Sequence, residues 1–587
     1  MTDNEDPTRS GQPDRGAQAQ ELRRRPVQCM VAPLPPDVLP AGVEPFQAEE
    51  LFTRLAADPE IEHRKRIKHP EPTPDAAAAE HPEVAVMAMP PHRVAALVRD
   101  PRVHIERNRH IRVASPSPQA AGAGILTINP GVQLRAAPPT PVAFLVTGSD
   151  SGPIEGANII VMSHEGNFQS STGPDGRATL YLAIHDLSAI TGVYVKPAAN
   201  YWEAYQSSPE ISTTTENIVV LRPLSETFPK LGERQITGWG LTALGLERIP
   251  PNYRGQGVKI AVIDSGLATG HPDLAGRVAG GEDFVEGGEG ASWSVDVIGH
   301  GTHCAGVVAA ADNGVGMLGI TVEAELHVCK VFPDGRYSEV IEALNYCIEH
   351  GIDVVNLSMG ADETSALLSQ AIERAREAGV ACIVAAGNSG GRVQFPGRLP
   401  SVLTVAAIGK LGQFPEGTYH AQQVLGQPDP QGYFSAAFTC YGPEVDVCAP
   451  GVAILSSVPD RGYAVWDGTS MATPHVTGLA ALVLAHHPDF REGFSTRNSE
   501  RVDRLFKIIK ESCRPLDFGD PGRTGAGLPN AMRALDLEPS ARAVTPELAQ
   551  LREAMQEAGL LTSAGVVLDP QEQVRRLLQA VGLLPAD

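Results

Sequence analysis

The chain has 587 residues, enough for about four domains and for at least one large hydrophobic core. Apolar residues make up 42% and charged residues 20%, and the 59 glycines and 49 prolines are typical of a loop-rich globular protein. Coiled-coil and fibrous classes are therefore excluded. The formal net charge of −22 makes binding to nucleic acid or to an anionic membrane surface unfavourable, because both need basic patches.

The sequence predicts no membrane-spanning segment, since no apolar run approaches the roughly 18 residues that a span needs. Residues 1–26 are polar and lack the apolar region of a secretory signal. We therefore expect a disordered leader and a cytoplasmic location, with non-classical export as an alternative. Several of the eight cysteines lie within apolar runs, where a reduced thiol behaves as a small hydrophobe, so we expect free thiols.

Residues 27–113 predict a small ferredoxin-like domain. The apolar periodicity alternates between that of strands and that of helices in the order β-α-β-β-α-β, which is the order of a split βαβ unit. The expected elements are strands at 27–32, 60–68, 83–89 and 102–106 and helices at 46–57 and 91–99.

The middle and the end of the chain differ from this domain in composition and in apolar pattern. Residues 114–141 are rich in Ser, Pro, Ala and Gly, which indicates a linker. Residues 142–223 contain short β-rich runs separated by turn clusters, which favours a small β-sandwich without a catalytic cluster. Residues 546–587 carry two amphipathic helical patterns, which we expect to dock or to dimerise.

Between residues 236 and 537, strands and helices alternate. The strand-like runs are almost entirely apolar, as expected for strands buried on both faces of a sheet, and helical patterns lie between them. The pattern predicts an α/β domain with a parallel, doubly wound sheet. The expected strands are 258–263, 326–331, 353–358, 380–386 and 402–408, and the expected helices are 300–311, 338–350, 363–378, 471–486 and 500–512.

Two segments of this region carry a carboxylate and a histidine. Asp264 directly follows a buried strand, and functional sites of doubly wound sheets form at such strand ends, although a lone Asp is more often a turn or cap residue. In residues 299–306 (GHGTHCAG), small residues let a helix begin close to neighbouring backbone and place His300 at its first turn. His303 and Cys304 follow at helical spacing, so zinc ligation by these three residues is an alternative.

Two further segments carry a hydroxyl and an amide. In residues 468–475 (GTSMATPH), Ser470 lies at the start of an apolar helix, where free amides and the helix dipole favour negative charge. An N-cap serine is the ordinary interpretation of such a position. In residues 385–390 (AAGNSG), Asn388 follows a buried strand and can donate a hydrogen bond to an oxyanion.

Taken together, these four segments resemble the subtilisin-like serine proteases, the subtilase family. The order Asp, His, Ser along the chain is that of subtilisin. The resemblance spans about residues 236–537 and implies a serine endopeptidase, in which Ser470 is the nucleophile, His300 the general base, Asp264 its partner and Asn388 the oxyanion donor. A catalytically silent peptide-binding scaffold and a zinc-dependent hydrolase are the alternatives.

The resemblance also implies where a protein or peptide substrate lies. It would be bound as an extended strand between residues 334–337 and residues 358–360, with main-chain hydrogen bonds on both sides. The implied substrate-binding residues are Gly335, Tyr337, Ser358, Met359, Gly360, Ala385, Ala386 and Gly387. Gln394 is expected near the floor of the S1 pocket, which receives the side chain before the cleaved bond.

A structural calcium ion is a further implication. Asp273 and residues 312–317 (DNGVGM) match the family's calcium loop, in which hard oxygen ligands are provided by side chains and main-chain carbonyls. The implied ligands are Asp273, Asn313, Ala311, Val315 and Met317. The alternative is an ordinary turn, because no ligand from the N-terminal side is matched. The sequence gives no role to the insertion at residues 411–433.

Finally, residues 27–113 resemble the subtilisin propeptide, an intramolecular chaperone and inhibitor. This resemblance implies a self-inhibited zymogen whose residues 108–113 lie in the substrate cleft as a strand and whose activation requires autocleavage. The predicted β-sandwich between the two domains departs from the family pattern and leaves the processing point open.

Overall fold

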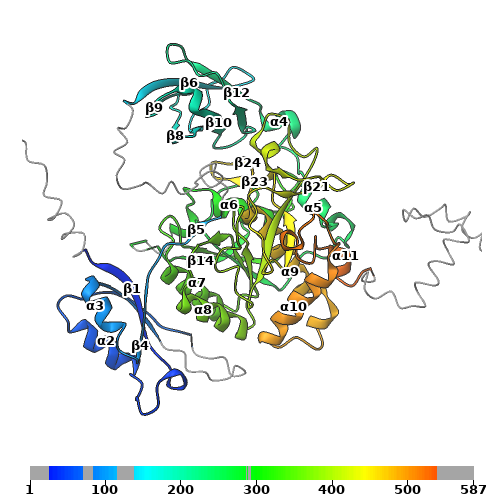
Figure 1. The fold of residues 1–587 in the computed structure, drawn as a ribbon. Helices are drawn as coiled ribbons and strands as arrows, with labels where there is room; N and C mark the ends of the chain where they lie inside the picture. The colour runs from blue at the N-terminus through cyan, green and yellow to red at the C-terminus, as the bar shows by residue number, and fades with distance from the viewer. Residues whose placement is uncertain (1–24, 71–82, 115–137, 286, 289–291, 539–587) are drawn as a thin grey trace, which may run out of the picture.

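In the computed structural model, residues 25–70, 83–114, 138–285, 287–288 and 292–538 are described. Most of the expected leader and linker, and the amphipathic patterns at 546–587, lie outside these residues. Figure 1 shows three folded units: a small sheet with helices (blue), a β-rich unit (teal) and a large α/β unit. Among the described residues, no helix is long and apolar enough to cross a membrane. All eight cysteines are buried and free.

The N-terminal unit is a four-stranded antiparallel sheet with the order β2-β3-β1-β4. Alternating residues of β1 face opposite sides, so Val31 packs on the helices of this unit whereas Met30 and Ala32 belong to a core shared with the large unit. Its elements are β1 (Val27–Pro33), α2 (Ala48–Ala56), β2 (Glu62–Ile67), β3 (Val84–Met89), α3 (Pro91–Leu97) and β4 (Val103–Arg107).

The second unit is a sandwich of two sheets, with the orders β11-β10-β7-β8 and β12-β6-β9. A single apolar core fills the space between the sheets. Its strands are β6 (Thr140–Gly148), β7 (Asn158–Ser163), β8 (Gly166–Ser171), β9 (Arg177–Leu182), β10 (Ile190–Lys196), β11 (Ala204–Ser207) and β12 (Asn217–Leu221), and α4 (Leu224–Thr227) follows them.

The large unit is built on a nine-stranded sheet with the order β14-β15-β13-β16-β18-β19-β21-β20, in which β22 also pairs with β19. The pairs from β14 to β19 are parallel, which confirms the predicted α/β fold class. The strands are β13 (Lys259–Asp264), β14 (Val278–Asp283), β15 (Glu325–Lys330), β16 (Val354–Leu357), β18 (Ala381–Ala385), β19 (Leu403–Lys410), β20 (Val424–Leu425), β21 (Tyr433–Ala436) and β22 (Val447–Pro450).

Helices cover both faces of this sheet. Along β13, Ile260 and Val262 belong to the core that contains α6, α9 and α10, whereas Ala261 and Ile263 belong to the core that contains α7 and α8. The helices are α5 (Trp239–Ala243), α6 (His300–Ala309), α7 (Tyr337–Glu349), α8 (Ala366–Glu377), α9 (Thr469–His486), α10 (Ser499–Ser512) and α11 (Ala531–Ala534), and a hairpin of β23 (Ile454–Val458) and β24 (Gly462–Trp466) precedes α9.

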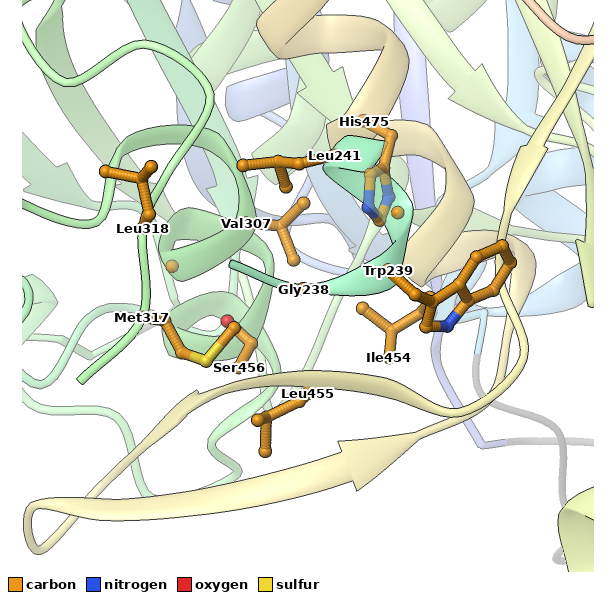
Figure 2. Close-up of a pocket in the computed structure, with 12 residues that line it drawn as sticks. Gly238, Trp239, Leu241, Val307, Met317, Leu318, Ile454, Leu455, Ser456 and His475 are labelled. Atoms are coloured by element: carbon orange, nitrogen blue, oxygen red, sulfur yellow. The ribbon is translucent and has the colours of Figure 1, made fainter. Parts of the chain in front are cut away.

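A small apolar pocket lies between α5, α6 and β23, as Figure 2 shows. Its volume is about 10 Å³, which is the lower limit for one water molecule, so it is a packing gap rather than a ligand site. His475 of α9 points into it, and a Cβ at Gly240 would lie 2.0 Å from His475 Nε2. Gly240 therefore allows α5 to approach α9 closely.

Both smaller units contact the large one. The N-terminal sheet lies beside α7 (Figure 1). Met30 and Ala32 of this sheet share a core with Val340 and Leu344 of α7. The β-sandwich contacts the β23–β24 hairpin, where Asn200 N donates to the carbonyl of Tyr463 at 2.6 Å. It also contacts the insertion at 411–433, where Tyr205 N donates to Gly417 O at 3.0 Å. The insertion contains the short 3₁₀ helix η5 (Tyr419–Gln423).

Candidate active site

Asp264 and His300 form a buried pair at the carboxyl edge of the sheet. Asp264 is the last residue of β13, and His300 is the first residue of α6. His300 Nδ1 donates to the Asp264 carboxylate, with distances of 2.8 and 2.9 Å to its two oxygens. Asp296 fixes the start of α6, because its carboxylate accepts hydrogen bonds from Gly299 N at 2.8 Å and from Thr302 N at 2.9 Å. The pair therefore rests on two anchored backbone segments.

The electrostatics of this pair favour a charged imidazole. Burial opposes the charge of His300, but the adjacent Asp264 carboxylate outweighs burial and raises the pKa of His300 well above 6.5. His300 Nε2 is buried and has no hydrogen-bond partner among the described residues. Because Nδ1 is held by the carboxylate, Nε2 is the nitrogen that can exchange a proton with another group.

Ser470 is the second residue of α9 and is fully buried. Its Oγ donates to the carbonyl of Ala114 and lies 3.1 Å from the carbonyl oxygen of Ser358. The hydroxyl thus faces a main-chain carbonyl of residues 110–114, and the described residues show no hydrogen bond between it and His300 Nε2. Such catalytic contacts often form only in the reacting complex.

The amide of Asn388 is oriented by the residue that precedes Ser470. Asn388 Oδ1 accepts hydrogen bonds from Thr469 N at 2.8 Å and from Thr469 Oγ1 at 2.9 Å. The Nδ2 group is buried and without a partner in the structure. An unpaired buried donor beside the Ser470 hydroxyl is costly unless it receives an acceptor, which is the property of an oxyanion donor.

Residues 110–114 lie as a strand between two segments of the large unit. On one side β5 (Arg112–Val113) pairs antiparallel with β17 (Met359–Gly360), and Ala114 N donates to Ser358 O at 3.1 Å. On the other side Ile111 N donates to Gly335 O at 2.7 Å. The sequence prediction for residues 334–337 and 358–360 thus agrees with two segments that hold an extended chain between them.

The predicted S1 walls enclose little space. A Cβ at Gly360 would lie 2.7 Å from Gln394 Oε1, and one at Gly387 would lie 2.5 Å from the same atom. The Gln394 amide is held there, because Nε2 donates to Asp362 Oδ1 at 3.1 Å. Ala385 and Ala386 are fully buried behind it. Gln394 therefore occupies the pocket between the two glycines.

A larger groove of about 810 Å³ adjoins this pocket. It is lined on one side by residues 107–110 and 112–114 and on the other by Arg336, Tyr337 and Gly360, together with Asn388. Ile111 points away from the groove and is buried in the core that contains Phe332 and Tyr337.

The zinc trio suggested by the sequence is not brought together. Cys304 Sγ lies 3.9 Å from His300 Nδ1, and these two groups with Asp264 form a cluster of potential ligands. His303 instead donates from Nε2 to Ile454 O at 3.0 Å and stacks on Trp466, and burial lowers its pKa to about 3. Burial also raises the pKa of Cys304, which keeps its thiol protonated.

The predicted calcium ligands are only partly convergent. The Asp273 carboxylate accepts hydrogen bonds from Met317 N, Ser457 Oγ and Tyr463 Oη at 3.0, 2.7 and 3.1 Å. Asn313 closes its own loop, since Oδ1 accepts from Val315 N at 3.1 Å.

A residue that the sequence analysis missed completes this region. Gln235 Nε2 donates to Ala311 O at 2.7 Å and lies 3.4 Å from Met317 O. Gln235 thus approaches this loop from the N-terminal side, where the sequence analysis matched no residue.

Comparison with known proteins agrees with this geometry. The sequence profile of the subtilase family matches residues 255–503. The thermostable alkaline protease of Halalkalibacterium halodurans is 32% identical over 356 residues, which cover 60% of this chain and 85% of that protein. Subtilisin DY of Bacillus licheniformis is 35% identical over 310 residues, or 51% of this chain and 99% of that protein. Subtilisin E of Bacillus subtilis is 38% identical over 261 residues, or 43% of this chain and 60% of that protein.

The chain belongs to the subtilase family. It is a subtilisin-like serine endopeptidase, and its substrates are proteins or peptides.

The opposite environments of the two histidines on α6 give a measurable difference. In a full chain that carries Ser470→Ala, the ring of His300 should titrate above pH 6.5, and Asp264→Asn should lower its pKa, because the compensating charge is lost. Histidine-selective NMR checks this, with His303 as an internal control that stays neutral down to about pH 3. A His300 pKa at or below 6.5 in both chains would contradict the electrostatic account.

Proposed function

We propose that this chain hydrolyses peptide bonds through an acyl-enzyme at Ser470 and is made as a zymogen inhibited by its own N-terminal unit. The observation that carries the proposal is the contact between Ser470 Oγ and the carbonyl of Ala114, at the end of a strand held in the cleft. A peptide carbonyl beside a nucleophilic hydroxyl is the arrangement that acyl transfer requires.

The chemistry follows from the side chains already described. Ser470 Oγ attacks the scissile carbonyl carbon while Nε2 of His300, which must be in its neutral form at this step, takes the proton, and Asp264 stabilises the resulting imidazolium. The tetrahedral oxyanion accepts hydrogen bonds from Asn388 Nδ2 and from the main-chain N–H of Ser470. His300 then protonates the leaving amine, and water hydrolyses the acyl-enzyme by the reverse proton path. Loss of such an asparagine costs subtilisin roughly 10²–10³ in turnover.

Inhibition follows from how the N-terminal unit is anchored. Glu106 caps α8, because its carboxylate accepts a hydrogen bond from Ala366 N at 3.0 Å and contacts Ser365 Oγ. Asn108 Oδ1 accepts a hydrogen bond from Ser338 N at the start of α7 at 3.1 Å. A strand tethered in this way competes with substrate at a high effective concentration, so modest affinity suffices to block the cleft.

We infer the processing point from the contact between Ser470 and Ala114. Ala114 is the residue whose carbonyl meets Ser470, which makes the bond between Ala114 and Ser115 the one to be cut. Cleavage there separates residues 1–114 from the rest and leaves the β-sandwich attached to the mature enzyme.

This proposal predicts different products for wild type and Ser470→Ala. The wild-type chain should release a fragment ending at Ala114, whereas Ser470→Ala should stay full length, because peptide hydrolysis loses a factor on the order of 10⁶ without the nucleophile. Intact mass spectrometry of the products checks this. Processing of the Ser470→Ala chain at the same bond and rate, in a preparation free of other proteases, would disprove the assignment of Ser470 as the nucleophile.

The position of Gln394 predicts which side chains the S1 pocket accepts. Because its amide fills the space between Gly360 and Gly387, we propose that the S1 pocket accepts small residues such as alanine. Gln394→Gly should raise kcat/KM for peptides with phenylalanine before the cleaved bond by about 10–200-fold relative to alanine peptides.

Gln394→Met is the matched control, because it keeps the side-chain volume and should keep the preference for alanine. A peptide-library profile of the processed enzyme measures all three proteins. Equal cleavage after phenylalanine and alanine by the wild-type enzyme would refute this role of Gln394.

We also propose that calcium binds between Gln235 and the loop at 311–317. The carbonyl oxygens of Ala311 and Met317 converge on one end of the Gln235 amide, so turning that amide would bring three oxygens together and require a cation. The Asp273 carboxylate beside them provides the negative charge. Bound to the native state only, the ion would add about 2.7 kcal/mol of stability at one hundred times its Kd.

Millimolar calcium should therefore raise the Tm of the Ser470→Ala chain. Asp273→Ala should lower the Tm without calcium, since three donors lose their acceptor, and should also abolish the calcium-induced increase. Asp312→Ala is the control: this exposed carboxylate pairs with Arg254 at 3.0 Å, and its loss should leave the increase intact. A Tm insensitive to calcium would show that the Gln235 amide closes the loop by itself.

A further inference from the structure

A second buried cluster joins three parts of the chain. Glu203 lies between β10 and β11 of the β-sandwich, His420 lies in η5 of the insertion, and Asp467 directly follows β24, three residues before Ser470. The three residues are 8%, 0% and 9% exposed. His420 Nδ1 donates to Asp467 Oδ1 at 2.7 Å and lies 3.5 Å from Glu203 Oε1.

The groups that surround His420 define its charge. Besides the two carboxylates, the titratable groups facing it are Lys196, Tyr194 and Tyr419. Tyr194 Oη donates to Glu203 Oε2 at 2.5 Å, and the Lys196 ammonium lies 4.5 Å from the centre of the Trp466 ring. Burial opposes the charge of His420, but Asp467 and Glu203 outweigh burial and raise its pKa to about 9. Burial also raises the pKa of Glu203, although His420 opposes this shift. His420 is therefore the buried cation of the cluster at neutral pH, hydrogen-bonded to Asp467.

A proton suits this cluster better than a metal ion. The same three side chains could offer one ligand atom each to a metal. However, ligands of a tetrahedral zinc ion at about 2.0–2.1 Å lie roughly 3.3 Å apart. The 2.7 Å distance from His420 Nδ1 to Asp467 Oδ1 is that of a direct N–H···O hydrogen bond.

The cluster is connected to the active site through four consecutive residues. Asp467 Oδ1 also accepts a hydrogen bond from Ala453 N at 2.7 Å, and Gly468 N donates to Gly451 O at 2.8 Å. Thr469 comes next and holds the Asn388 amide through two hydrogen bonds, and Ser470 follows it. A shift of Asp467 would therefore move the nucleophile and the oxyanion donor together.

We propose that Glu203 and His420 are positioning residues, through which the β-sandwich and the insertion fix the Asp467–Ser470 segment in its reactive geometry. This inference rests on the proposed role of Ser470. Below the ordinary histidine pKa of 6.5, the charged His420 stabilises the folded state in full. This stabilisation is lost as the pH rises from 6.5 through about 9, because two buried carboxylates then face each other without a cation between them.

The expected result is a fall of kcat above about pH 9 with little change in KM. Glu203→Gln should move this alkaline limb to lower pH by about one unit, because His420 loses one of its two counter-charges. His420→Gln should lower kcat at least about tenfold at neutral pH, as a misplaced nucleophile does, and should abolish the alkaline limb. Glu165→Gln is the matched control. Glu165 is a carboxylate of the β-sandwich that pairs with exposed His185, so its replacement should change neither kcat at neutral pH nor the alkaline limb.

The experiment uses the enzyme that forms when the full-length chain processes itself. Active sites are counted with a peptidyl phosphonate that labels Ser470, and kcat and KM are measured from pH 6 to 10.5 for a peptide with alanine before the cleaved bond. A wild-type chain that does not react with the phosphonate overturns the proposed function itself.

Three other outcomes overturn only the positioning role. One is an unchanged pH profile of kcat in both cluster variants. Another is a lower Tm or fewer titrated sites with an unchanged kcat per site, which would make the cluster a structural tie. The third is the finding of one metal ion per wild-type chain that both variants lose. This would show that a metal ion, and not a proton, links the three side chains.

Discussion

Asp264 is fully buried at the end of β13, and a carboxylate in that position needs compensation that water cannot supply. Two donors provide it: Ser265 N at 2.8 Å and the Nδ1–H of His300. This need fixes the tautomer of His300 and brings α6 close to the sheet. A Cβ at Gly301 would lie 2.3 Å from Gly266 O, so the approach is possible only with a glycine in the first turn of α6. The availability of His300 Nε2 thus follows from the burial of the Asp264 carboxylate, which holds the other nitrogen of the ring.

Main-chain pairing on both sides of the cleft explains why side chains matter at few positions. Residues 110–114 are held by carbonyls and amides of Gly335, Ser358 and Gly360, contacts that any extended peptide can make. Selectivity then depends on the pockets between the strands. Gln394 narrows the predicted S1 pocket, and Ile111 is buried in an apolar core. In the proposed zymogen, residues 110–114 would therefore display the preferences expected of a good substrate.

The parts of the structure that the sequence predicted are those governed by local patterns. Strands buried on both faces are almost entirely apolar, which located β13, β15, β16, β18 and β19 to within two residues. Asp264 ends β13, and Asn388 lies in the turn that follows β18. Contacts between distant segments were not predictable in this way. Gln235 meets its partners 76 and 82 residues later, and the side chain of Gln235 carries no pattern. The Glu203, His420 and Asp467 cluster forms only when the β-sandwich and two distant segments of the large unit are placed together.

The two accessory units differ in how they are bound. Besides its apolar contact, the N-terminal unit is attached by the pairing of β5 with β17, by the hydrogen bonds of Glu106 and Asn108, and by partly exposed ion pairs such as Lys65 with Glu342. Each of these ion pairs contributes little, because water screens exposed charges. The β-sandwich is attached through buried charges, and separating Glu203 from His420 would leave uncompensated charges in a dry environment. This difference fits the proposed processing, in which the N-terminal unit is released and the β-sandwich stays attached.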